Sequence, residues 1–191
     1  MMFTGKRIIW LGIIVALLQS GALYAMVEQR ASILRHGKDV ILLSEPVDPR
    51  DFLRGDYVTL SYDISTIIAG KVSGTRPTSS GLVNIYVTLA KGSDERWIFV
   101  AASWEPRTDL NPEEVQIRGN MQNYGYLAPD GTYRVSYGIE RYYVPEGQGI
   151  AIEDQQRKRN IDVVIAVSDE GQAQIRSLRS DGKVLYEEPL Y

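Results

Sequence analysis

The stretch PRDFLRGDYVTLSYDIS places a cluster of charged side chains directly before an alternating apolar segment. Asp48, Asp51 and Asp56 could supply the carboxylate oxygens that a hard cation such as Ca²⁺ prefers. Their spacing matches no EF-hand loop, and the arginines between them would compete with a cation as counter-charges. We name residues 48–56 the acidic corner, and the sequence predicts no resident metal there.

Hydrolysis is a second chemistry that these residue types allow. Glycoside hydrolysis needs two carboxyl groups that flank a cleft. Glu140 and Glu146 are distant partners for Asp56, although nothing in the spacing brings them together. A periplasmic hydrolase that uses the acidic corner around Asp56 is therefore the alternative function. The sequence favours a role without catalysis but does not decide it.

The composition limits other chemistry. The chain of 191 residues contains no cysteine and one histidine, His36. A thiolate zinc site, a cysteine nucleophile and a multi-histidine metal site are therefore excluded, and a Ser-His-Asp triad is not favoured. We expect no cofactor.

The acidic corner also has a purely structural interpretation. Asp51 and Arg54 stand three residues apart, so one helical turn would bring them together as an ion pair. Asp56 can accept backbone N–H groups at a turn, and Gly55 permits the positive φ that such a turn often needs. The corner would then fix the entry to a strand.

A second charged and aromatic segment is ERYYVPEG, residues 140–147. Tyr142 and Tyr143 are adjacent, so one of them faces away from the core if the strand is regular. Exposed tyrosine and arginine side chains often anchor interfaces. Both segments therefore favour an interaction module. The candidate interaction residues are Asp48, Arg50, Asp51, Arg54, Gly55, Asp56, Tyr57, Leu60, Tyr62, Glu140, Arg141, Tyr143 and Glu146.

These residues must be positioned by a mainly β domain. Short apolar or alternating runs predict strands at 39–44, 56–64, 82–90, 96–104, 113–121, 128–138 and 139–144, and a three-stranded meander at 161–187. Residues 70–81 predict a mobile loop, and 150–160 is the one helical pattern. We expect a β-sandwich or a barrel-like sheet with one late helix.

The alternation within 56–64 assigns the faces of that strand. Val58, Leu60 and Tyr62 share one face, and Tyr57 points to the other. We expect the Tyr62 ring to lie in the core with its hydroxyl group at an edge.

The N-terminal segment predicts a membrane helix. Ile8–Val27 is a run of twenty residues without a charge, which as a helix would span about 30 Å, the thickness of the hydrocarbon layer. Lys6 and Arg7 precede it and favour a cytoplasmic N-terminus. The competing interpretation is a signal peptide cleaved after Ala22. The anchor interpretation, which we favour, predicts a single-pass protein of the inner (cytoplasmic) membrane with its C-terminal domain in the periplasm.

The membrane helix is predicted to continue to His36 and to end at Gly37. This boundary separates an anchor, residues 1–36, from an exported domain, residues 37–191. Small residues recur every four positions at Gly12, Ala16 and Ser20. Such a stripe lets a second transmembrane helix approach closely.

The charge distribution argues against binding of nucleic acid. The formal net charge is -3, and removing Lys6 and Arg7 from the 21 basic residues leaves 19 against 24 acidic residues, or -5, for residues 28–191. An acidic domain without a basic stripe is a poor nucleic-acid binder. The expected contacts are the lipid bilayer and a protein partner.

Residues 55–62, GDYVTLSY, read G-D-Y-x-x-L-x-Y without a mismatch, and the chain resembles the GDYXXLXY family named after that motif. The resemblance extends through PVDPRDFLRGDYV, YGIERYYVPEGQG and VVIAVSDEGQAQIRSL. Phe52-Leu53 departs mildly from the pattern, because the two apolar residues are expected in the other order. The resemblance implies a bacterial membrane-anchored protein of a family whose members tend to be encoded beside multi-spanning membrane proteins. It supports the membrane location and a membrane partner, and it implies no particular reaction.

Overall fold

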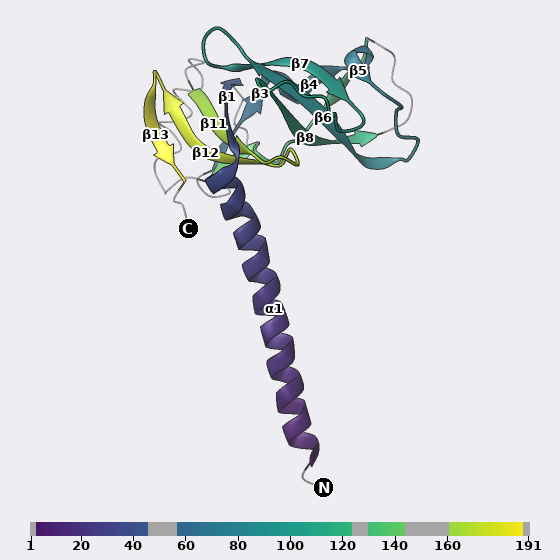
Figure 1. The fold of residues 1–191 in the computed structure, drawn as a ribbon, viewed down its shortest axis with the longest axis vertical. Helices are drawn as coiled ribbons and strands as arrows, with labels where there is room; N and C mark the ends of the chain where they lie inside the picture. The colour runs from purple at the N-terminus through teal and green to yellow at the C-terminus, as the bar shows by residue number, and fades with distance from the viewer. Residues whose placement is uncertain (1–2, 46–56, 124–129, 144–160, 189–191) are drawn as a thin grey trace.

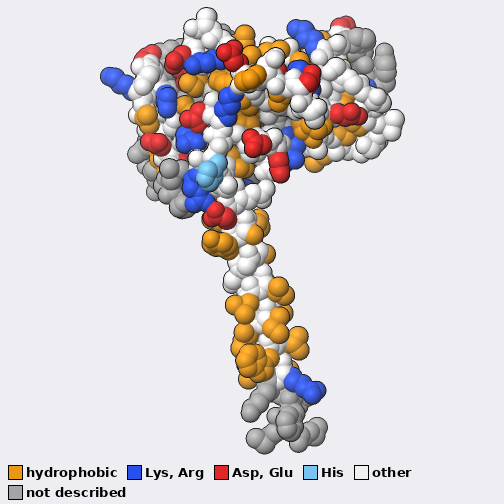
Figure 2. Space-filling model, in the orientation of Figure 1, with side chains coloured by type: hydrophobic (Ala, Val, Ile, Leu, Met, Phe, Trp, Pro, Cys, Tyr) orange, Lys and Arg blue, Asp and Glu red, His pale blue; other side chains and the backbone are white. Residues whose placement is uncertain are grey.

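The computed structural model describes residues 3–45, 57–123, 130–143 and 161–188. One long α-helix, α1 (Phe3–His36), projects from a β-rich domain, and the N-terminus lies at the far end of that helix (Figure 1). Hydrophobic side chains cover the projecting helix, whereas charged side chains are spread over the domain (Figure 2).

The described residues form short strands in four sheets. The strands are β1 (Lys38–Glu45), β2 (Tyr57–Thr59), β3 (Ser61–Tyr62), β4 (Thr66–Ile68), β5 (Val72–Ser73), β6 (Gly81–Lys91), β7 (Trp97–Ser103), β8 (Glu114–Asn123), β9 (Thr132–Arg134), β10 (Arg141–Tyr143), β11 (Ile161–Val167), β12 (Ala173–Ser180) and β13 (Lys183–Glu187). Two single turns of 3₁₀-helix, η1 (Asp63–Ser65) and η2 (Ala69–Lys71), interrupt them.

Two larger sheets share one apolar core. The five-stranded sheet has the order β13-β12-β11-β1-β3, and the four-stranded sheet has the order β5-β7-β6-β8. Leu42 and Ile165 from the first sheet and Val87 and Ile117 from the second are fully buried in the same cluster. The small sheets β2-β10 and β4-β9 complete the described strands. The mainly β fold is therefore confirmed.

Strong alternation and turn signals located most strands correctly. The strands predicted at 39–44, 82–90, 96–104 and 113–121 are β1, β6, β7 and β8, and the meander is β11 to β13. Asp181 and Gly182 join β12 to β13 with φ values of 48° and 75°. Positive φ at both central residues defines the hairpin turn whose twist matches its strands.

The strand predicted at 56–64 is divided in the structure. β2 pairs with β10, β3 pairs with β1, and Leu60 lies between them. The segments on either side of Leu60 pair with different strands, so residues 56–64 do not form one continuous strand. The 3₁₀-helix η1 then begins at Asp63. The runs at 128–138 and 139–144 likewise shorten to β9 and β10.

Two further expectations differ from the structure, and a third lies outside the described residues. The predicted loop at 70–81 contains β5, which pairs in parallel with β7, and the Ser73 hydroxyl donates to the Ala102 carbonyl at 3.0 Å. The described strands form separate open sheets, so the barrel-like alternative is wrong for this part of the chain. The late helix predicted at 150–160 lies outside the described residues.

The projecting part of α1 has the character of a membrane span. Residues 8–27 are exposed along their whole length. The segment Arg7–His36 is long enough to cross a bilayer, with a mean hydropathy of 2.0 over its most apolar window. A membrane anchor and a signal sequence both fit this helix.

The C-terminal end of α1 packs on the five-stranded sheet without a linker. Ile33 and Leu34 bury their side chains against Ala166 of β11. Gly37 follows at once, and its amide donates to the Ile33 carbonyl at 2.8 Å. A Cβ atom at Gly37 would lie 2.6 Å from the Ile33 oxygen and 3.0 Å from the Val167 nitrogen. Glycine is needed here for close approach, and β1 begins at the next residue.

We predict that Gly37→Ala destabilises the full-length protein by about 1–3 kcal/mol, because the added methyl group overpacks a backbone contact. Gly21→Ala is the matched control, since a Cβ atom there meets nothing within 4 Å. Thermal unfolding of both variants in detergent, followed by near-ultraviolet circular dichroism, measures the difference. Equal melting temperatures would contradict the contact.

Candidate functional site

The structure brings together part of the two segments that the sequence singled out. β2 and β10 pair antiparallel, with Thr59 opposite Arg141 and Tyr57 opposite Tyr143. The buried side chain of Leu60 lies next to this pairing. The remaining candidates lie outside the described residues: Asp48, Arg50, Asp51, Arg54, Gly55, Asp56 and Glu146.

Two buried tyrosines join these segments by hydrogen bonds in opposite directions. The Tyr62 hydroxyl donates to the Ile139 carbonyl at 2.7 Å, and the Tyr137 hydroxyl donates to the Ile64 carbonyl at 2.7 Å. The Leu60 amide adds a bond to the Glu140 carbonyl at 2.8 Å. The Tyr62 ring lies in the core as predicted, but the expectation that its hydroxyl lies at an edge is wrong, because the group is needed to satisfy a buried carbonyl.

Glu140 holds the turn between these tyrosines. Its carboxylate accepts the backbone N–H of Gly138 at 3.0 Å and that of Tyr137. Gly138 has a φ of 81°, a conformation that glycine adopts without strain. Both carboxylate oxygens of Glu140 are therefore used to fix the backbone of the turn.

Burial changes the acidity of the tyrosines around this turn. Removal from water raises the pKa of the Tyr62 phenol, and the Glu140 carboxylate raises it further. Burial and Glu140 also raise the pKa of Tyr137, with a smaller contribution from Asp63. The hydroxyl groups therefore stay protonated and donate their hydrogen bonds over the whole neutral range.

Tyr142 is the member of the adjacent tyrosine pair that faces inward. Its side chain is buried, its ring stacks edge-to-face on Tyr186 at 5.4 Å, and its hydroxyl donates to Glu188 at 3.0 Å. Burial and the Glu188 carboxylate raise the pKa of this phenol. The side chain of Tyr143 lies outside the described part of the chain, so its role as an interface candidate stays a prediction.

A groove of about 640 Å³ lies beside these residues, between α1 and the domain. We name it the juxtamembrane groove. Its helix side consists of Val27, Arg30, Ala31 and Leu34, and its domain side consists of Gly138, Ile139, Arg141, Tyr142, Gln174, Ile175 and Glu188. Sequence reasoning missed Arg30, although the spacing of the helix residues already placed them on one face.

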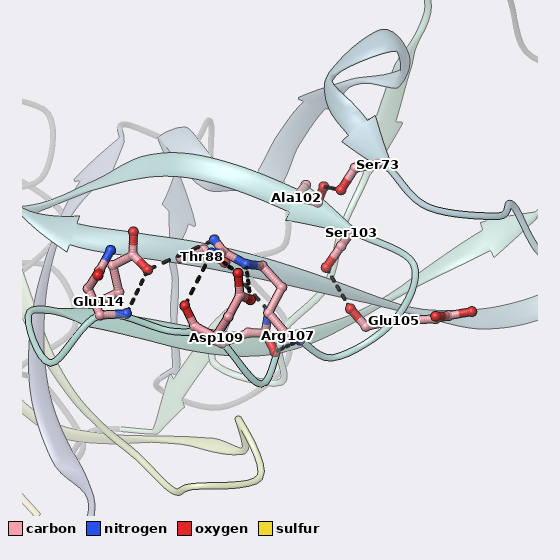
Figure 3. Close-up of polar contacts among 10 residues, drawn as sticks. Ser73, Thr88, Ala102, Ser103, Glu105, Arg107, Asp109 and Glu114 are labelled. Carbon is pink, nitrogen blue, oxygen red and sulfur yellow. Dashed lines mark hydrogen bonds and ion pairs between the residues drawn. The ribbon is translucent and has the colours of Figure 1, made fainter.

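A second hollow of about 440 Å³ is lined in part by the loop between β7 and β8. Arg107 binds both carboxylate oxygens of Asp109, at 3.0 and 3.2 Å (Figure 3). The hydrogen bond from Arg107 holds the pKa of Asp109 below its usual range. The Glu114 carboxylate accepts a hydrogen bond from the backbone N–H of Asn111 at 3.1 Å. These charges organise the loop itself.

No group of three or more His, Asp or Glu side chains that could hold a metal ion occurs within the described residues. The three aspartates proposed as cation ligands are in the acidic corner, outside that part of the chain. In the helix, Gly12, Ala16 and Ser20 are all exposed, so the small-residue stripe faces open space.

The chain matches the family model described as GDYXXLXY protein over residues 19–178, and it belongs to this family. The match covers the second half of α1 and the β domain as far as β12. No curated protein and no solved structure matches the chain.

We predict that the free energy of unfolding falls as pH rises above about 10, where tyrosines ionise in the unfolded chain but the raised pKa keeps Tyr62 protonated in the folded one. Each such tyrosine contributes a slope of about 1.4 kcal/mol per pH unit. Tyr62→Phe should reduce the slope by that amount and cost about 1–3 kcal/mol at neutral pH through the unpaired carbonyl.

Urea unfolding of the full-length protein in detergent, repeated across alkaline pH, measures both effects. Tyr86→Phe, at a half-buried tyrosine on β6, controls for loss of a hydroxyl elsewhere. An unchanged alkaline slope in Tyr62→Phe would show that this hydroxyl is not sequestered.

Proposed function

We propose that the chain is a membrane-anchored, exported interaction module that works as an accessory subunit of a multi-spanning membrane protein. The observation that carries this proposal is the form of α1. Its apolar part is fully exposed, and its last turns are built into the β domain without a linker. A long apolar helix that the domain leaves uncovered needs a bilayer or another apolar surface around it.

The same helix favours an uncleaved anchor over a signal peptide. Cleavage after Ala22 would leave a mature N-terminus with Leu23, Tyr24 and Met26 exposed to water at 63%, 70% and 63%. The family match begins at residue 19, before that cleavage position. Both observations support retention of the helix. Lys6 and Arg7 support a cytoplasmic N-terminus and a periplasmic domain.

Binding fits the described residues better than hydrolysis does. Glu140 was one of the two distant acids considered as a hydrolytic partner, and backbone amides occupy its carboxylate. A residue fixed in this way is not available as a general acid or base without breaking the turn. The hydrolase alternative therefore rests on Asp56 and Glu146 alone.

We expect a reporter enzyme that is active only outside the cytoplasm to be active when fused after Tyr191. Green fluorescent protein fused at the same position is the matched control, and it should stay dark if the domain is exported unfolded. Mass spectrometry of the membrane-bound protein should find its N-terminus at Met1 or Met2. A mature N-terminus at Leu23 would contradict the anchor but keep the export.

Substitutions in the small-residue stripe test the proposed multi-spanning partner. Replacing Gly12 and Ala16 together with leucine should weaken co-purification of a multi-spanning protein, because bulk on that face separates two helices whose packing contributes about 1–2 kcal/mol. Gly21→Leu, off the stripe, is the control. Tyr143→Ala or Arg54→Ala in the domain should act additively with the stripe variant.

Normal insertion with unchanged co-purification in the double-leucine variant would contradict a role of the stripe. Turnover of a substrate by the protein without any partner would contradict the accessory role and favour the hydrolase alternative.

A further inference from the structure

The juxtamembrane groove lies at a defined height along α1. If Ile8–Val27 spans the hydrocarbon layer, the groove begins at the edge of that layer, because Val27 is its lowest residue on the helix. Arg30 stands three residues further on, or about 4.5 Å along the helix axis. A headgroup layer is about 5–7 Å thick. The Arg30 guanidinium therefore lies at the level of lipid phosphate groups.

The lining of the groove combines apolar and charged residues. Val27, Ala31 and Leu34 form an apolar helix face, and Ile139 and Ile175 of the domain stand opposite it. This apolar lining is continuous at Val27 with the exposed apolar surface of the membrane helix. An acyl chain that follows the helix can thus remain in apolar surroundings up to the groove.

Arg30 is the charged residue on the helix side of the groove. Glu188, an acidic residue of the described lining, already accepts the Tyr142 hydroxyl. Glu28, the other acid near this level of the helix, binds Arg35 instead. Among the described residues, Arg30 makes no ion pair, and its side chain is exposed. An anionic group at this height would complete the site.

We propose that the juxtamembrane groove binds an anionic phospholipid, with the phosphate at Arg30 and an acyl chain along the Val27 face. The proposal rests on the proposed membrane anchor. The bound lipid would fill the space between α1 and the domain and hold the domain at a fixed height above the bilayer. Arginine suits this role because its guanidinium group donates two parallel hydrogen bonds to phosphate oxygens.

The test uses full-length protein reconstituted in vesicles of equal parts phosphatidylcholine and phosphatidylglycerol, then extracted into mild detergent. Lipid that stays with the protein is quantified by mass spectrometry, and it should be enriched in phosphatidylglycerol. Arg30→Gln should reduce this enrichment about fivefold, equivalent to about 1 kcal/mol for one basic side chain at an anionic membrane surface. Arg30→Lys should retain most of it.

Arg134→Gln is the matched control, because it removes an exposed arginine of β9 outside the groove and should leave the enrichment unchanged. Equal enrichment in wild type and Arg30→Gln would overturn the proposal. Binding of inorganic phosphate by the wild type without any enrichment of phosphatidylglycerol would also overturn it, since the site would then bind a free anion. Unchanged lipid with weaker co-purification of the membrane partner in Arg30→Gln would assign the groove to that partner.

The same experiment distinguishes a failure of the proposed anchor from a failure of the proposed lipid site. If the protein does not enter the vesicles at all, the proposed anchor fails and the lipid site fails with it. If the protein inserts but shows no preference for phosphatidylglycerol, only the lipid site fails.

Discussion

The close contact between Gly37 and Val167 determines how the rest of the molecule is arranged. A Cβ atom at Gly37 would lie 3.0 Å from the Val167 nitrogen and oxygen, so glycine lets the end of α1 approach β11 closely, and β1 enters the five-stranded sheet at the next residue. Ile33 and Leu34 extend this contact by packing on Ala166. We therefore expect the helix and the sheet to move as one body. Under the proposed anchor, such a helix would set the height and the orientation of the domain, which a flexible linker would leave free.

The part of the family motif whose side chains the structure describes acts through buried groups at the point where the chain changes sheets. Leu60 and Tyr62 occupy the core, and the hydroxyls of Tyr62 and Tyr137 satisfy carbonyls of each other's segment. Phenylalanine at either tyrosine position would leave a buried carbonyl unpaired. The L-x-Y half of the motif thus has a structural explanation that needs no ligand. It positions the turn at Gly138 and Glu140, and with it one wall of the juxtamembrane groove.

Local patterns predicted the parts of the fold that local interactions determine. The meander of β11 to β13 follows from alternation and from the turn at Asp181-Gly182. The division of 56–64 could not be predicted in this way, because it results from pairing with β10 and β1, strands distant in the sequence. The burial of the Tyr62 hydroxyl was missed for the same reason, since its acceptor belongs to residue 139. The groove depends on the placement of α1 against the domain. In the sequence, its only indication is the spacing of Val27, Arg30, Ala31 and Leu34, which places them on one helix face.

The central claim is that an intact α1 connects the bilayer rigidly to the β domain, and an electron spin resonance distance measurement tests it most directly. The chain has no cysteine, so Leu18→Cys on the exposed helix and Asn84→Cys on β6 can carry spin labels without background. In full-length protein in lipid nanodiscs, the account predicts one narrow distance distribution. A broad distribution, or loss of the helix label by cleavage before the domain, would contradict it.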